Sequence, residues 1–247
     1  MIDTHAHLDA VADPSAALMR ARDAGVERVI TVGTGLESCR AALELAERED
    51  GVVAALGIHP HQAGGAEAEK LAELRQLLEH DRAVAVGETG LDFFRDYAPR
   101  DRQQALFEAE LALAGELELP VVVHSRAADD ETLAALRGHR GTVVLHCFSS
   151  PALLPAALEQ GWYVSFAGNV TYPKAEELRA AAARIPEDRI LAETDTPYLA
   201  PQPRRGRPNE PANVVHTVEA LAAVRGVPAE ELTARMDANA DEAFSLP

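Results

Sequence analysis

Histidines that could bind a metal ion lie at the very start of the sequence. His5 and His7 form a His-x-His pattern at the end of the first predicted strand. Residues two apart lie on the same face of a strand, so both imidazoles can reach one ion. The chain has nine histidines, and His59 and His61 form the pattern a second time, so the pattern needs support from elsewhere.

Four further ionisable residues provide that support through their positions. Each lies at or just past the end of a separate apolar run: Glu88 after AVAVG, His124 after PVVV, His146 after TVVL, and Asp195 shortly after Ala192. In a parallel barrel these strand ends converge on the face where active sites are found. An ionisable side chain there costs free energy unless it is paired. We therefore expect a metal site in preference to a hydrogen-bonded polar layer or metal-free acids and bases.

The size of this set predicts two divalent cations. Six ligands exceed the four of a tetrahedral ion, whereas two ions bridged by a carboxylate would use them all. Glu88 is the expected bridge, with His5, His7 and Asp195 completing one site and His124 and His146 the other. Such a centre activates water for hydrolysis, with Glu88 and Asp195 as the catalytic carboxylates. Four histidines suit Zn²⁺ or Mn²⁺.

The elements that carry these residues alternate regularly along the chain. Apolar runs predict strands at Met1–Thr4, Arg28–Val32, Val52–Leu56, Ala83–Val86, Pro120–Val123, Thr142–Leu145, Tyr163–Phe166 and Arg189–Ala192. Helical spacing predicts helices at Ser15–Ala24, Ser38–Glu49, Glu67–His80, Arg100–Glu116, Glu131–Arg137, Ala152–Gln160 and Lys174–Arg184. Eight such units predict an α/β fold, a (β/α)8 TIM barrel, with an open doubly wound sheet as the alternative. Two C-terminal helices, Asn213–Arg225 and Pro228–Phe244, complete a single predicted domain over residues 1–247.

Composition excludes several classes of protein. The chain has 247 residues, 47% of them hydrophobic, which argues against disorder. Its net charge of −17 argues against general adhesion to nucleic acid or anionic membranes, although a local cleft could still bind an anion. Two cysteines fit a reducing compartment, and neither a signal peptide nor a membrane span is evident. We expect a cytoplasmic protein without a membrane or an obligate protein partner.

Seven segments resemble the TatD family of metal-dependent deoxyribonucleases. They are IDTHAHLD, GIHPH, GETGLDFF, PVVVHSR, VLHCFSS, ETDTPYLAP and RGRPNEPANV, and they span the chain from Ile2 to the helices after Asn213. The resemblance implies a TIM barrel related to the amidohydrolases and two divalent cations, for which the family often accepts Mg²⁺. It also implies hydrolysis of DNA, often 3′-to-5′ on single strands. The family ligands correspond to His5, His7, Glu88, His124, His146 and Asp195.

Residues around the expected centre could bind substrate. His59, Arg95, Arg126 and Arg205 could contact phosphates of DNA, with RNA as a further substrate. Phe93, Phe94 and Tyr198 could stack on bases. The alternative substrate is an ester or amide, as in a D-aminoacyl-tRNA deacylase. A metal-binding module without activity is disfavoured because the ligand set is complete.

Overall fold

The computed structural model describes residues 1–95 and 97–246. In this part of the chain eight parallel strands pair in chain order. They are β1 (Ile2–Ala6), β2 (Arg28–Gly33), β3 (Val52–Leu56), β4 (Ala83–Asp92), β5 (Val121–Arg126), β6 (Val143–Leu145), β7 (Tyr163–Phe166) and β8 (Ile190–Ala192). The segment after β8 returns to β1 through a parallel bridge between Ala6 and Thr196. The predicted barrel is therefore confirmed, and the open sheet is excluded.

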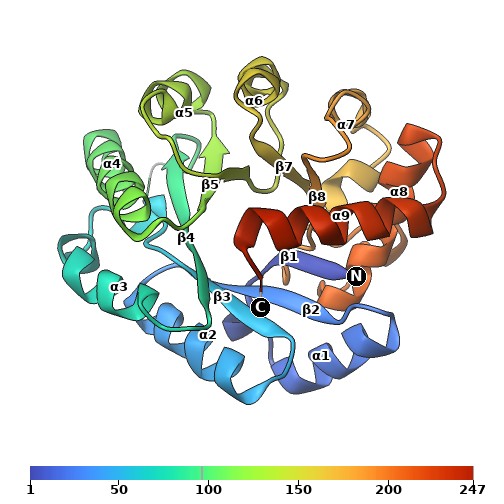
Figure 1. The fold of residues 1–247 in the computed structure, drawn as a ribbon, viewed down its shortest axis with the longest axis horizontal. Helices are drawn as coiled ribbons and strands as arrows, with labels where there is room; N and C mark the ends of the chain where they lie inside the picture. The colour runs from blue at the N-terminus through green and yellow to red at the C-terminus, as the bar shows by residue number, and fades with distance from the viewer. Residues whose placement is uncertain (96, 247) are drawn as a thin grey trace.

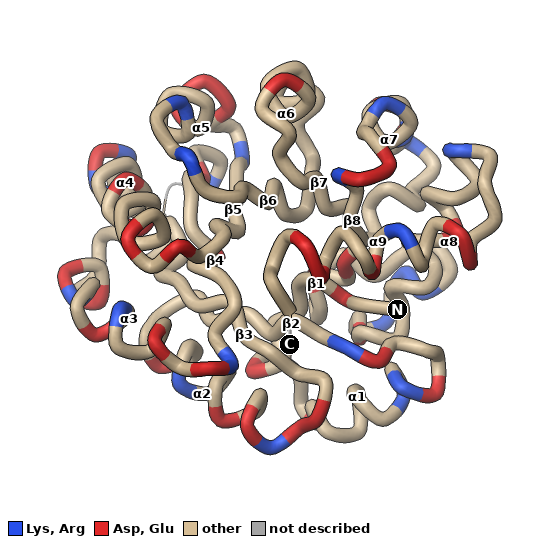
Figure 2. Tube along the Cα trace, in the orientation of Figure 1, with Lys and Arg blue, Asp and Glu red and all other residues tan. Residues whose placement is uncertain are grey.

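Helices surround this barrel (Figure 1). They are α1 (Pro14–Asp23), α2 (Leu36–Arg48), α3 (Leu71–Leu78), α4 (Arg100–Leu117), α5 (Asp129–Leu136), α6 (Leu154–Gln160), α7 (Glu176–Ala182), α8 (Val214–Arg225) and α9 (Ala229–Phe244). Local sequence sets their ends: the Asp13 side chain accepts a hydrogen bond from the Ala16 amide at the start of α1. Gly161 and Gly226 follow α6 and α8 with φ of 68°. Figure 2 shows the charged residues spread over these outer helices.

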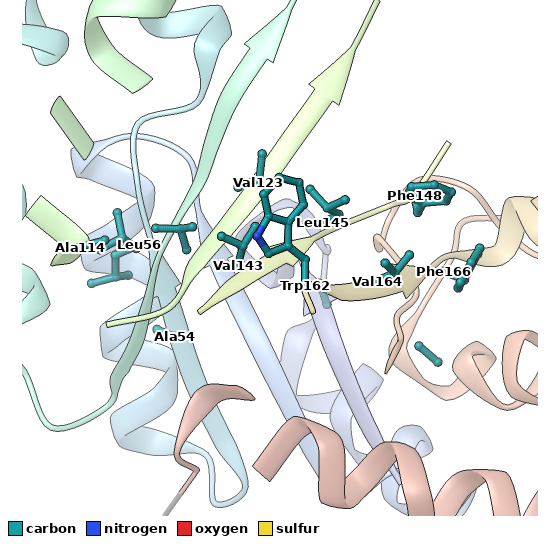
Figure 3. Packing of buried hydrophobic residues seen from close by; sticks show 14 of the residues in the cluster. Ala54, Leu56, Ala114, Val123, Val143, Leu145, Phe148, Trp162, Val164 and Phe166 are labelled. Carbon is teal, nitrogen blue, oxygen red and sulfur yellow. The ribbon is translucent and has the colours of Figure 1, made fainter. Parts of the chain in front are cut away.

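Two apolar layers hold the strands in place. The outer layer packs strands against helices, and Figure 3 shows Leu56, Val123 and Val164 from three strands together with Ala114 from α4. The inner layer fills the barrel with strand residues such as Ile30, Val53, Val122 and Leu191. Helix α9 adds Ala240, Ala243 and Phe244 to this inner layer. The amino-terminal end of the barrel is thus filled by apolar side chains, which leaves the carboxyl end for chemistry.

Some predicted bounds differ from the structure. Strand β4 continues beyond Val86 to Asp92, so Glu88 lies within the strand and not after it. Gly87 and Gly90 have φ of 137° and 131°, and the ladder with β5 shifts register along this stretch. The predicted helix Glu67–His80 consists of a 3-10 turn over Ala66–Glu69 followed by α3.

Across residues 1–95 and 97–246, no helix is both long enough and apolar enough to cross a bilayer.

Candidate metal centre

Glu88 lies at the middle of a histidine cluster at the carboxyl end of the barrel. Its Oε1 atom is 2.9 Å from His124 Nδ1, 3.0 Å from His146 Nε2 and 3.2 Å from His59 Nε2. These imidazoles come from β5, from the residue after β6 and from the loop after β3. Glu88 itself is only 3% exposed. One carboxylate oxygen therefore faces three ring nitrogens supplied by three parts of the barrel.

The second oxygen of Glu88 faces the His-x-His pair. His5 Nε2 and His7 Nε2 each lie 3.5 Å from Glu88 Oε2 and 3.3 Å from each other. Asp195, in the loop after β8, approaches from the other side, with Oδ1 3.4 Å from His7 Nε2. The backbone fixes this approach, because the Asp195 amide donates to the carbonyl of His5 at 3.0 Å. All six ligands predicted from the sequence are thus drawn into one cluster.

Burial and neighbouring charges shift the pKa values of these groups in different directions. Burial lowers the pKa values of His7, His124 and His146, but nearby carboxylates more than offset it and raise all three. Burial, reinforced by the charge of His146, lowers the pKa of His5 to about 3, so its ring is neutral. Burial alone would raise the pKa of Glu88, but the neighbouring His59 and His146 hold it well below its usual range. No lysine or arginine within the described ranges forms an ion pair with Glu88. In the described part of the chain its charged partners are imidazoles, and a set of imidazole and carboxylate donors fits a divalent cation.

Three groups of side chains bring their potential ligand atoms within 4.8 Å of one another. They are His5–His7–Glu88, His59–Glu88–His124 and His5–His146–Asp195. Nitrogen and carboxylate donors of this kind bind Zn²⁺ and other divalent ions. The grouping differs in two respects from the expected division. His59 joins Glu88 and His124 where His146 was expected, and His146 groups instead with His5 and Asp195. The assignment of ligands to individual ions stays a prediction.

Two carboxylates outside the predicted set support the histidines. Glu193 Oε1 lies 3.1 Å from Nδ1 of His146 and accepts the Cys147 amide at 2.8 Å. Asp92 Oδ2 lies 2.8 Å from His61 Nε2 and 3.4 Å from His124 Nε2. Sequence reasoning missed the role of Glu193, although it directly follows β8, the position that identified the other ligands. Carboxylates in such positions orient histidine ligands.

The residues predicted to bind substrate occupy different places. His59 lies inside the cluster. The Arg126 guanidinium lies 4.1 Å from the centre of the Phe94 ring, and that of Arg95 lies 6.0 Å from it. Arg205 stacks on Tyr172 at 4.4 Å and donates to its hydroxyl at 2.7 Å. The three arginines lie on segments at the carboxyl end of the barrel, and their contact with phosphate stays a prediction.

The whole chain resembles known proteins. The family described as TatD related DNase matches residues 2–245. The chain belongs to this family. A metal-dependent hydrolase of Mycobacterium tuberculosis, described as uncharacterized and named TatD, is 40% identical over 100% of this chain and 98% of its own length. The TatD protein of Pantoea vagans, named a 3'-5' ssDNA/RNA exonuclease, is 40% identical over 95% of this chain and 94% of its own.

Solved structures of TatD proteins have the same barrel. The Escherichia coli K12 homologue YjjV is 35% identical, with a TM-score of 0.93 over 100% of this chain and 98% of that protein. A TatD-family hydrolase from Entamoeba histolytica, at 21% identity and a TM-score of 0.88, supports the fold alone. The chain is therefore a member of a family of metal-dependent hydrolases, and its cluster carries groups that could hold the metal.

Proposed function

We propose that this TatD protein is a metal-dependent nuclease that hydrolyses phosphodiester bonds of DNA, acting 3′ to 5′ on single strands. The observation that carries the proposal is the Glu88 carboxylate, whose two oxygens face imidazole nitrogens from several strand ends of the barrel. The name of the Pantoea vagans relative, at 40% identity, supports nucleic acid as the substrate. RNA is a further substrate that this relative's name includes.

The donor set would hold two divalent cations. His5, His7, Glu88 and Asp195 would bind one ion, and Glu88, His124 and His146 the other, with His59 available beside Glu88. When bound, divalent cations lower the pKa of water and offset negative charge on a phosphate. Mg²⁺, Mn²⁺ and Zn²⁺ are the candidates. Glu88 would fix the spacing of the ligands, because both of its oxygens are engaged.

Other residues would handle the proton and the phosphate. Asp195 is 9% exposed and lies at the edge of the cluster, where it can accept a proton from the attacking water. Arg126, Arg95 and Arg205 would contact phosphates of the bound strand as bidentate donors. This arrangement explains how a chain of net charge −17 could bind a polyanion, because the attraction would be confined to the site.

The test is cleavage of a 5′-labelled single strand by metal-stripped protein, with Mg²⁺, Mn²⁺ and Zn²⁺ restored one at a time. We expect a ladder of shortening products that appears only with metal. This pattern would establish the activity, the 3′-to-5′ direction and the preferred ion together. If no ion restores cleavage although metal is bound, the proposal is wrong. An aminoacylated RNA assayed in parallel would then test the ester alternative.

A further inference from the structure

Three exposed aromatic rings surround the metal centre. Phe94, Tyr97 and Tyr198 are 62%, 65% and 58% exposed. Within residues 1–95 and 97–246, Met19 is the one other large hydrophobic residue with comparable exposure, at 58%, and it lies on the outer helix α1. Isolated exposed apolar residues are common and need no explanation, but a grouping around a site indicates binding. We call Phe94, Tyr97 and Tyr198 the aromatic rim.

Tyr198 joins the aromatic rim to the cluster on one side. Its ring centre lies 5.9 Å from that of His7, with the planes inclined at 69°. The backbone around it is held at both ends: the Tyr198 amide donates to the Asp195 carbonyl at 2.8 Å, and its carbonyl accepts from Asn209 at 2.7 Å. The backbone that displays this exposed ring is therefore tied directly to Asp195 of the cluster.

The β4 side of the aromatic rim is held by Asp92. The Phe94 amide donates to Asp92 Oδ1 at 3.0 Å, and the same carboxylate contacts His61 and His124 through Oδ2. The Tyr97 ring lies 4.7 Å from that of His61. One carboxylate thus connects the turn that displays Phe94 to a histidine of the cluster. Phe93, which the sequence placed among the stacking candidates, is 9% exposed and packs in the core instead.

The negative net charge of the protein makes aromatic contacts important for binding a nucleic acid. A chain of net charge −17 gains little long-range attraction for a nucleic acid. Stacking of a base on an aromatic ring contributes about 1–3 kcal/mol and does not depend on net charge. Arg126, 4.1 Å from the Phe94 ring centre, presents a second flat group beside the same ring. The aromatic rim can therefore contribute affinity for a nucleic acid that the net charge of the protein does not provide.

We propose that Phe94, Tyr97 and Tyr198 bind unpaired bases next to the scissile phosphate, so that the protein selects strands whose bases are free to stack. This inference rests on the proposed nuclease function and names what that site requires of its substrate. A duplex keeps its bases stacked inside and offers no base faces to the rim. Selection of single strands then follows from these rings and not from the metal ligands.

The test compares strands with and without bases on the metal-loaded protein. Binding of a fluorescent phosphorothioate single strand, which resists hydrolysis, is measured by anisotropy beside an abasic strand of the same length. We expect Phe94→Ala and Tyr198→Ala each to weaken binding of the base-bearing strand about 5- to 150-fold, the equivalent of one stacked base. Binding of the abasic strand should stay unchanged, and Phe94→Trp should retain binding.

Controls separate the rim from the nuclease function. Met19→Ala removes an equally exposed apolar side chain on α1 and should change neither strand's binding. Equal losses on both strands, or no loss on either, would overturn the rim while the wild-type protein still cleaves DNA. If the wild-type protein neither binds nor cleaves either strand with metal bound, the nuclease proposal fails, and the rim fails with it.

Discussion

Glu193 and His146 form a carboxylate–imidazole pair, with Glu193 Oε1 3.1 Å from Nδ1 of the ring. The other ring nitrogen of His146 lies 3.0 Å from Glu88 Oε1. The imidazole is therefore held between a carboxylate outside the predicted ligand set and the carboxylate at the centre of the cluster. A pair of this kind fixes which nitrogen keeps its lone pair and increases the basicity of the ring.

This relationship predicts the effect of removing Glu193. We expect Glu193→Ala to weaken metal binding about 10- to 100-fold. Glu193→Gln should lose less metal affinity, because its amide oxygen can still accept a hydrogen bond from Nδ1 of His146. Zinc affinity measured by chelator competition checks both variants. Glu187→Gln, which alters an exposed carboxylate, serves as the control and should bind zinc like the wild type. Wild-type affinity in Glu193→Ala would contradict the positioning role.

Replacement of Glu88 should impair the protein more than replacement of Glu193. Glu88→Gln keeps the shape of the side chain but removes the charge that faces five imidazoles. We expect cleavage to fall by more than about 100-fold, because a ligand matters more than the group that orients it. Circular dichroism should show a folded barrel, since the two apolar layers are untouched. Full activity in the variant would rule out Glu88 as a metal ligand.

The burial of Glu110 on α4 predicts that the stability of the protein depends on pH. Burial raises its pKa to about 8, and hydrogen bonds from the Thr89 hydroxyl and the Ile58 amide oppose the rise. Between the ordinary value of 4.5 and about 8, the unfolded state loses a proton that the folded state keeps. The free energy of unfolding therefore falls as the pH rises through this window, by about 1.4 kcal/mol per unit at most.

Glu110→Gln removes this proton exchange. We expect the free energy of unfolding of the variant, relative to the wild type, to increase from about pH 5 to about pH 8 by a few kcal/mol. Urea unfolding of both proteins at several pH values measures the difference. Titration of the histidines occurs in both proteins and cancels in the comparison. A constant difference across the window would show that Glu110 does not stay protonated in the folded state.

Replacement of Phe244 measures how much α9 contributes to the stability of the barrel. The side chain is 2% exposed and belongs to the cluster inside the barrel. Phe244→Ala should lower the free energy of unfolding by about 3–5 kcal/mol, because a cavity is left among strand residues. Met19→Ala should change it by less than about 0.5 kcal/mol. A similarly small effect of Phe244→Ala in urea unfolding would mean that the barrel interior does not depend on α9.

Periodicity in the sequence is sufficient to predict the eight alternating strands and helices and, for a parallel sheet, the convergence of the six residues. Apolar runs identified each strand, and the residue type at each run's end identified the cluster. Closure could not be predicted, because it depends on the Ala6–Thr196 bridge between distant segments. The length of β4 could not be predicted from the local sequence pattern either, because glycines such as Gly87 and Gly90 usually interrupt a strand. In the structure, pairing of residues 89–92 with β5 continues β4 past Gly87 and through Gly90.

Side-chain direction limited what could be predicted of the site. His59 is predicted from the sequence to contact a phosphate, yet its Nε2 atom lies 3.2 Å from Glu88 Oε1. Phe93 and Phe94 are adjacent and of the same type, but one packs in the core and the other is exposed. Spacing along the chain does not decide such cases, because the turn after β4 sets where each ring points.

The contribution of α9 to the barrel interior has a consequence for synthesis on the ribosome. Strand β1 (Ile2–Ala6) is translated before the other seven strands, but the segment after β8, which it meets at closure, and Phe244 are translated after them. Until residue 244 has left the exit tunnel, the barrel lacks the α9 side chains that complete its interior. Apolar strand surfaces are exposed throughout that interval, and such surfaces are what chaperones bind. The earliest of the eight strands to be translated is therefore among the last to become buried.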